Sequence, residues 1–548
     1  MKRLILMAVF AACLPFKELT AQVEKPKLIV GIVVDQMRID YLYRFEDKFS
    51  DNGFKRLMRD GFFGRNTHYN YVPTYTGPGH ASVFSGTTPS VHGIIANDWY
   101  SKAIKKKINC VDDSTVTAVG NANGGKSYSP INMLSTNLAD ELKIATQGEA
   151  VVVGVSIKNR GAILPGGHFP NGAYWFDDKT GNFVTSTYYK KQLPGWVIAF
   201  NKRKLAREYM TGQWETLLPI AQYTESGPDD NPYEVKLGNS KQPVFPYDLT
   251  AIRKKDGDYG SLPRTPFGNT IVADLAKSAI AGEQMGKDDV TDLLTVSFSS
   301  TDYIGHLFGP DAKEIEDCYL RLDKDLADLF AYLDEEVGQG EYTVFLTADH
   351  AVAQVPQFLI DKKIPAGYIK QKPIESIVIR GIEEKYGKAD WIESVSNDQI
   401  FLNHRVLNEK KINKNEFMDD MISILLTFQG IKNVFKGTDM NTREYSKGIR
   451  SRLQLGYNVK RSGDLLLVYE PGWFQTGYGK TGTTHGSGYN YDTHVPLLMY
   501  GKGIPAGYNS VKPISITDIV PTLCLLYEIN LPNGANGQPI EEVFQNNQ

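Results

Sequence analysis

The sequence predicts an α/β fold: a three-layer α/β/α sandwich with a mostly parallel central sheet and an inserted cap subdomain. Short apolar runs of roughly four to eight residues recur along the chain, which is typical of strands buried on both faces. Segments with helical apolar spacing and charged outer positions separate these runs. The composition becomes densely charged between about residues 356 and 462, which indicates a cap inserted into the sandwich.

The N-terminal segment has the pattern of a secretory signal. Two basic residues precede the apolar run Leu4–Phe16, which is too short to span a bilayer, since a span takes about 20 residues. We expect residues 1–21 to be a signal peptide and residues 22–548 to form one catalytic domain. We therefore expect a periplasmic or secreted protein, and a lipoprotein anchored at Cys13 is the alternative. No later segment is apolar for long enough to predict a membrane span.

Five apolar runs predict the central strands, and one long segment predicts a covering helix. The predicted helix, Ala312–Leu333, alternates apolar and charged positions at helical spacing. The predicted strands are Lys27–Val34, Ala150–Ile157, Leu293–Phe298, Tyr342–Thr347 and Val495–Tyr500.

Two further regions decorate the predicted sandwich. Residues from about 165 to 263 are rich in Tyr, Gly and Pro, and we expect them to form a loop-rich face beside the active site. Within the cap, from about 356 to 462, a short alternating run at Gln399–Leu402 predicts a strand. The spacing at Asn415–Phe428 predicts a helix.

Composition excludes several classes of protein. The chain is 22% charged and 41% hydrophobic with a formal net charge of −3, which excludes a disordered polyelectrolyte. The same balance argues against a nucleic acid as a stable partner, because such proteins normally carry a basic excess. Four cysteines exclude a disulfide-built scaffold. We expect the protein to be a monomer.

Acidic and histidine residues gather where predicted strands end. In open α/β sheets, ligands bind outside the carboxyl ends of the strands. Taken singly, each of these residues could be a helix cap, a turn or a surface pair. Together with a later histidine they form a carboxylate and imidazole set that suits Zn²⁺ and could supply three ligands to each of two ions. The set is Asp35, Asp302, His306, Asp349, His350 and His485.

Thr76 is the candidate nucleophile. It lies in a Gly- and Pro-rich turn, after which a helix can begin at Ala81–Phe84. Free N–H groups at a helix N-terminus favour an anion there. A threonine hydroxyl is a weak nucleophile and needs a base or a metal, which the neighbouring ligand set could provide. Taken alone, the residue could equally be an ordinary N-cap.

In their order along most of the chain, these motifs resemble the alkaline phosphatase superfamily. The resemblance includes Thr88–Gly93 after the Thr76 helix and a closing helix at Ile516–Leu523. It implies two Zn²⁺ ions side by side and a covalent phosphothreonine intermediate on Thr76. The ligands it implies are Asp302, His306 and His485 for one ion, and Asp35, Asp349, His350 and the Thr76 oxygen for the other.

Two threonine-dependent branches of the superfamily fit this sequence. A sulfatase is excluded, because the Thr76 region lacks the Cys and Arg of that motif. Asn97 suits both the nucleotide pyrophosphatase/phosphodiesterases and the phosphate-irrepressible alkaline phosphatases of the PafA type. Lys158 and Arg160 resemble the cations of the PafA type, and extra cations favour a doubly charged monoester over a diester.

The resemblance therefore implies a zinc-dependent phosphomonoesterase of broad specificity that binds phosphate monoesters through Asn97, Lys158 and Arg160. A phosphodiesterase is the alternative, and a non-catalytic envelope binding protein is a weaker one. His80 and His92 lie close to Thr76 in sequence and are unassigned. No separate Mg²⁺ site is predicted.

Overall fold

The computed structural model describes residues 24–121 and 126–545. The expected signal peptide and Cys13 lie outside these residues. Within the described ranges, no helix combines the length and the apolar character needed to cross a bilayer.

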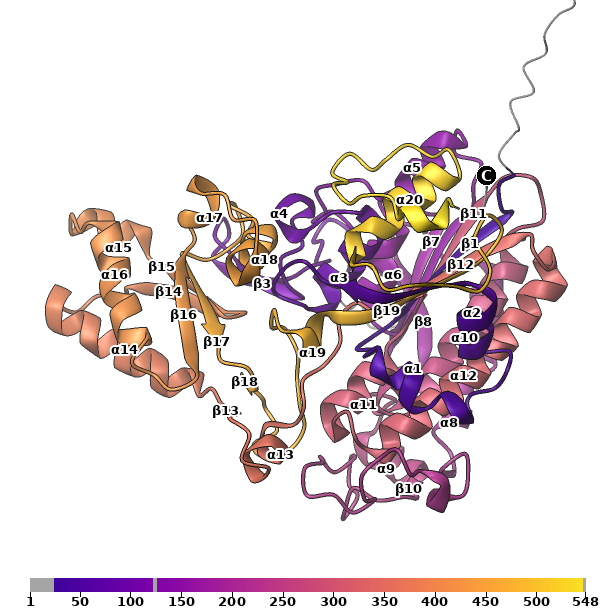
Figure 1. The fold of residues 1–548 in the computed structure, drawn as a ribbon, viewed down its shortest axis with the longest axis horizontal. Helices are drawn as coiled ribbons and strands as arrows, with labels where there is room; N and C mark the ends of the chain where they lie inside the picture. Colours follow the sequence, from indigo (N-terminus) through magenta and orange to yellow (C-terminus); the bar gives the residue numbers. More distant parts are fainter. Residues whose placement is uncertain (1–23, 122–125, 546–548) are drawn as a thin grey trace, which may run out of the picture.

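The centre of the molecule is an 11-stranded sheet (Figure 1). Five neighbouring strands at its middle, from β12 to β7, run parallel to one another. This arrangement confirms the predicted α/β class. The order across the sheet is β20 (Tyr508–Ser510), β2 (Phe62–His68), β19 (His494–Gly501), β12 (Tyr342–Thr347), β1 (Leu28–Val34), β11 (Asp292–Phe298), β6 (Val152–Ser156), β7 (Gly172–Asp177), β8 (Asn182–Ser186) and β5 (Ala118–Val119), with β21 (Ile514–Ser515) also paired to β2.

All five predicted strands belong to this sheet, but one runs against the others. The run at Val495–Tyr500 forms β19, which pairs antiparallel with both β12 and β2. Strand β2 was not predicted. Strands β7 and β8 fall within the stretch expected to be loop-rich, and they extend the sheet on its other side.

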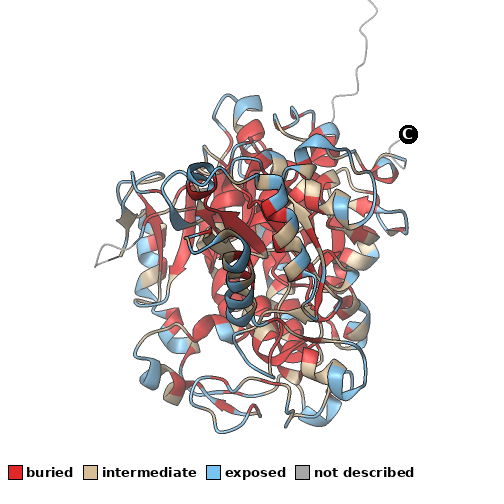
Figure 2. Ribbon diagram, turned by 90° about the vertical axis from the view of Figure 1, so that its left-hand side faces the viewer, coloured by how far each residue is buried: buried red, intermediate tan, exposed pale blue. Residues whose placement is uncertain are grey.

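Helices cover both faces of the sheet. The covering helix predicted at Ala312–Leu333 is α12 (Lys313–Leu333), which packs with α2 (Phe54–Asp60) and α10 (Phe267–Gly282) on one face. The opposite face carries α3 (Thr76–Ser85), α5 (Leu138–Ala145), α6 (Asn159–Gly166) and α20 (Ile519–Leu526). The strands β1, β6, β11 and β12 between these layers are buried along their whole length, and Figure 2 shows exposed residues mainly on outer helices and loops. Strand burial on both faces explains why the runs are continuously apolar.

A second, smaller sheet lies to one side of the sandwich, in orange in Figure 1. It packs against α14 (Gln371–Tyr386) and α16 (Lys414–Leu425) around a core of its own. The Asn397 side chain donates a hydrogen bond of 2.6 Å to the carbonyl of Asp98 in β3 (Asp98–Ser101), which joins this part to the sandwich. Its strand order is β14 (Ile392–Ser396), β15 (Gln399–Leu402), β17 (Leu465–Tyr469) and β16 (Ile431–Lys436), so the sheet extends past residue 462.

Candidate metal centre

Four adjacent parallel strands end at one edge of the sheet, and each leads into residues singled out from the sequence. Their order is β12, β1, β11 and β6. The carboxyl ends of parallel strands meet at one edge, which is the usual ligand-binding edge of such sheets. Asp349 and His350 follow β12, Asp35 follows β1, Asp302 and His306 lie on α11 (Ser300–Phe308) after β11, and Lys158 and Arg160 follow β6.

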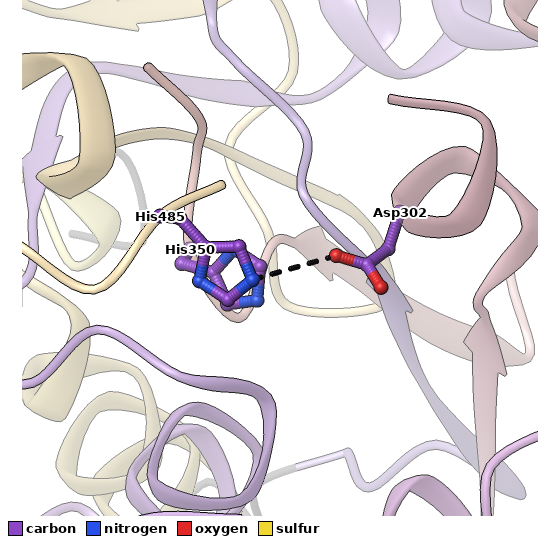
Figure 3. A group of neighbouring side chains, drawn as sticks. All are labelled: Asp302, His350 and His485. Carbon is purple, nitrogen blue, oxygen red and sulfur yellow. Dashed lines mark ion pairs between the residues drawn. The ribbon is translucent and has the colours of Figure 1, made fainter. Parts of the chain in front are cut away.

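The side chains at this edge form two groups that could each hold a metal ion. One contains Asp35, Asp349 and His350, and the other contains Asp302, His350 and His485, with the ligand atoms of each group within 4.8 Å of one another. Figure 3 shows the second group, with His350 and His485 stacked opposite Asp302. The two rings lie 3.4 Å apart between centroids. His350 therefore belongs to both groups.

His306 approaches the same carboxylate from its own helix. Its Nε2 atom lies 3.2 Å from Asp302 Oδ1, and its ring centroid is 5.1 Å from that of His485. The predicted division of ligands gives His306 to the Asp302 site and His350 to the other site alone. In the structure, His350 belongs to the Asp302 group and His306 lies beside it, and the division stays a prediction.

Each of the three histidines is held in one tautomer by a backbone carbonyl. A carbonyl only accepts hydrogen bonds, so Nδ1 carries a proton, and in the neutral ring Nε2 keeps its lone pair. The Nε2 atoms face carboxylate oxygens, an arrangement that a cation between them would stabilise. The Nδ1 bonds run from His306 to Thr483 O (2.8 Å), from His350 to Ala351 O (3.0 Å) and from His485 to Thr74 O (2.8 Å).

Unpartnered buried atoms support the same interpretation. Among the described residues, Asp35 Oδ1, Asp349 Oδ2 and His350 Nε2 are buried without a hydrogen-bond partner. Burial, and then the charge of Asp35, raises the pKa of Asp349 well above its usual range. Burial, and then His485, lowers the pKa of His350. Carboxylate and neutral imidazole are the donors that Zn²⁺ takes, so the residues fit a metal centre.

Lys158 compensates the carboxylates in the structure. Its Nζ atom lies 2.6 Å from Asp35 Oδ2 and 2.6 Å from Asp302 Oδ2, so it joins one carboxylate of each group. Burial opposes the charged form, but Asp302 and Asp35 outweigh it and raise the pKa of Lys158. The sequence predicted a cation that faces substrate, whereas this contact is to the ligand carboxylates.

A cavity of about 500 Å³ lies beside Lys158. Lys158, Arg160 and Arg264 line it together with Trp175 and Tyr303. The Nε atom of Arg160 is buried and has no hydrogen-bond partner among the described residues. The cavity therefore offers positive charge and aromatic surface next to the candidate metal-ligand groups.

Thr76 is the first residue of α3 and is 1% exposed. The helix begins at Thr76 and not at Ala81, so the predicted start was wrong. The Gly77 N–H donates a 2.7 Å hydrogen bond to Asn97 Oδ1, which fixes that amide beside the helix N-terminus. Gly79 lies against the Asp349 backbone, where an added Cβ would collide with it.

His80 lies on α3 itself, and His92 is the last residue of the following helix, α4 (Pro89–His92). His80 Nδ1 donates to the carbonyl of Thr76 (2.9 Å), and its Nε2 bonds the hydroxyl of Ser297 (2.8 Å). His92 Nε2 bonds the hydroxyl of Ser82 (3.0 Å). Both rings are thus occupied by hydrogen bonds that hold the Thr76 helix.

Gln36 is a site residue that the sequence analysis missed. Its backbone N–H donates to Asp349 Oδ1 (3.1 Å) and its Nε2 donates to Asp302 Oδ1 (2.7 Å). Its backbone is left-handed, with a φ of 66°. A neutral amide after a strand gives no chemical signal in a sequence; only its position between two acids reveals its role.

The chain matches known proteins over most of its length. The family model of type I phosphodiesterase/nucleotide pyrophosphatase matches residues 29–490. Alkaline phosphatase PafA of Elizabethkingia meningoseptica and a protein of Myroides odoratus named calcium-transporting ATPase are each 44% identical over 96% of both chains. Alkaline phosphatase PhoV of Synechococcus elongatus is 40% identical over 95% of this chain and 94% of its own.

Solved structures agree with the sequence matches. The crystal structure of wild-type alkaline phosphatase PafA covers 95% of this chain and 99% of its own, with a TM-score of 0.90 and 45% identity. A mouse ectonucleotide pyrophosphatase/phosphodiesterase 5 has a TM-score of 0.51 at 15% identity, so it shares the fold. The predicted resemblance and fold are confirmed. The chain therefore belongs to the type I phosphodiesterase/nucleotide pyrophosphatase family, within the alkaline phosphatase superfamily.

Proposed function

We propose that this chain is an exported, zinc-dependent alkaline phosphatase of broad specificity that hydrolyses phosphate monoesters through a phosphothreonine intermediate. The observation that carries the proposal is the pair of carboxylate–imidazole groups sharing His350 at the strand edge that also bears Lys158 and Arg160. The alkaline phosphatases that match this chain over more than nine-tenths of its length support the same activity.

Two Zn²⁺ ions would be held by the six carboxylate and histidine side chains of the centre. Such ions lower the pKa of a bound hydroxyl or water and neutralise a leaving oxygen. If metal ions were bound to the carboxylates Asp35 and Asp302, Lys158 would be free to contact the substrate. The full ligand set is Asp35, Asp349 and His350 with the Thr76 oxygen, and Asp302, His306 and His485.

The residues of the chain have distinct roles in the proposed reaction. The Thr76 hydroxyl loses its proton as its oxygen attacks phosphorus and a Thr76 O–P bond forms; the ester P–O bond breaks, and the leaving oxygen takes up a proton to give the alcohol. Water then cleaves the Thr76 O–P bond, which releases inorganic phosphate and restores the hydroxyl. Asn97, Lys158 and Arg160 bind the nonbridging phosphoryl oxygens through both steps and hold the phosphoryl group in line.

The choice of a monoester depends on local charge. A monoester carries one more negative charge than a diester, and Lys158 and Arg160 supply matching cations beside the cavity. A phosphodiesterase is the second candidate, because the family includes that activity by name. The test is the ratio of kcat/KM for p-nitrophenyl phosphate to that for bis-p-nitrophenyl phosphate.

We expect that ratio to favour the monoester and to fall by at least about tenfold in Lys158→Ala and Arg160→Ala, as each loses a charge-assisted contact. Lys179→Ala, at the outer cavity wall, is the matched control. A preference for the diester that neither active-site variant alters would overturn the monoester assignment.

A further inference from the structure

Two buried glutamates lie outside the metal centre. Glu234 is 4% exposed and Glu314, in the first turn of α12, is fully buried. Among the described residues, neither oxygen of Glu234 has a hydrogen-bond partner, and Glu314 Oε2 has none either. The remaining oxygen, Glu314 Oε1, accepts from the hydroxyl of Tyr247. Three carboxylate oxygens therefore stay unsatisfied in the interior.

No basic side chain compensates this pair. In the described part of the chain, neither glutamate forms an ion pair, while Asp229 adds negative charge beside both. Burial, and then the charge of Glu314, raises the pKa of Glu234, and the Asn231 side chain opposes the rise. Burial also raises the pKa of Glu314. Burying an unpaired carboxylate costs several kcal/mol, so the pair needs a proton or a cation.

We propose that Glu234 and Glu314 bind a divalent cation of the Ca²⁺ type. The donors that carry the proposal are carboxylate oxygens beside the phenol of Tyr247, and such oxygens suit a hard cation rather than Zn²⁺. Ca²⁺ tolerates irregular and bidentate carboxylate geometry, whereas Mg²⁺ requires a near-ideal octahedron. This site is separate from the proposed dinuclear centre and does not depend on the proposed activity.

The position of the pair gives the cation a structural consequence. The N–H of Val235 donates to the carbonyl of Leu307 on α11 (2.9 Å), and the carbonyl of Tyr233 accepts from Gly482 (2.9 Å). Helix α11 carries Asp302 and His306, and the Gly482 loop leads to His485. A cation bound to Glu234 would therefore stabilise the segment around Glu234, which contacts both α11 and the Gly482 loop.

The test uses Tb³⁺ as a luminescent substitute for Ca²⁺ in the full chain, with zinc supplied throughout. Trp214 lies 5.3 Å from Tyr247 between ring centroids, so excitation of these rings sensitises Tb³⁺ bound at Glu314. We expect sensitised luminescence that Ca²⁺ displaces, and a Ca²⁺-dependent rise in Tm. Both should be lost in Glu234→Gln and Glu314→Gln and kept in Glu409→Gln, whose carboxylate is on the surface.

Two results would overturn the proposal. One is Tb³⁺ luminescence and a Ca²⁺ response in Glu234→Gln equal to those of the wild type, which would locate the ion elsewhere. The other is a wild-type Tm that does not change with Ca²⁺, together with a higher Tm for Glu234→Gln than for the wild type. That result would mean that the two glutamates share a proton. Because glutamine has the size of glutamate and needs no counter-charge, the variants should fold. None of these measurements uses phosphatase activity, so their outcome does not depend on the proposed function.

Discussion

At the scale of single residues, Gln36 connects the two ligand groups. It donates from its backbone to Asp349 and from its side chain to Asp302, which belong to different groups. A non-glycine residue with a φ of 66° costs of order 1 kcal/mol or more, so surrounding contacts must hold it. Gly305 leaves the room that the amide needs, because a Cβ there would collide with Gln36 Oε1.

Replacing Gln36 should weaken metal binding. In Gln36→Leu the Asp302 carboxylate loses its donor, and loss of such a partner typically costs about 10–100-fold in metal affinity. Competition with a zinc chelator measures this change. The matched control is Gln357→Leu, which removes a surface hydrogen bond to Asp361. Equal zinc affinity in Gln36→Leu and the wild type would contradict the positioning role.

The sequence could indicate the acids and histidines of the centre because their chemistry is explicit and they follow apolar runs. It could not indicate Gln36, because an amide has many ordinary uses. Nor could it show Lys158 between Asp35 and Asp302, since that contact depends on β1, β11 and β6 being neighbours.

At the scale of elements, the start of α3 shows where turn signals mislead. Gly77, Pro78 and Gly79 read as a loop, but they form the first turn of the helix. The first N–H groups of a helix have no partner within it, so a proline there removes no hydrogen bond. The early start places the Thr76 side chain at the helix N-terminus.

Gly79→Ala should separate α3 from the metal centre. A Cβ there would lie 2.7 Å from Asp349 Cβ and would also collide with the Asp349 carbonyl. Overpacking of this kind costs about 1–3 kcal/mol, and here it also displaces a metal ligand. We expect a lower Tm and reduced bound zinc. The control is Gly195→Ala on α7 (Gly195–Lys202), where no atom lies within 4 Å of an added Cβ; equal losses in both variants would contradict this account.

The start of α5 carries a pH-dependent contact. Both ring nitrogens of His168 face acceptors, Asp140 Oδ2 (2.8 Å) and the Met133 carbonyl (3.1 Å), which favours the protonated ring. Burial lowers the pKa of His168, but the Asp140 hydrogen bond outweighs it and the pKa is raised. A raised histidine pKa contributes stability that is present below about pH 6.5 and is lost as pH rises through the folded-state pKa.

His168→Gln should therefore lower Tm more at pH 6 than at pH 9. Thermal unfolding of both proteins across that range gives the difference directly. Asp140→Asn should remove the pH dependence, with an additional loss at all pH values because Asp140 also caps α5 with Asn137. A difference that grows with pH would contradict the protonated pair.

At the scale of the whole molecule, sequence patterns located the buried strands but not every strand direction. A buried run looks the same whichever way it points, so the antiparallel β19 could not be distinguished from its parallel neighbours. Strands β7 and β8 lie among loops and were hidden by the composition around them. The charged composition after residue 356 did indicate a distinct part, which has a core of its own around residues such as Trp391 and Phe417.

Metal removal should loosen the sandwich and spare the second sheet. The proposed ions would tie together β1, α11, β12 and the His485 loop, which are distant in sequence, whereas the core containing Phe417 includes no residue of these parts. At a free zinc concentration near 1,000 times Kd, each site adds about 4 kcal/mol to the folded state, or roughly 10³-fold in opening equilibrium. Hydrogen exchange should therefore accelerate in β12 and α11 on chelation and recover with Zn²⁺. Helix α16, in the second sheet's core, is the internal control, and equal acceleration there would show that the metals support the chain as a whole.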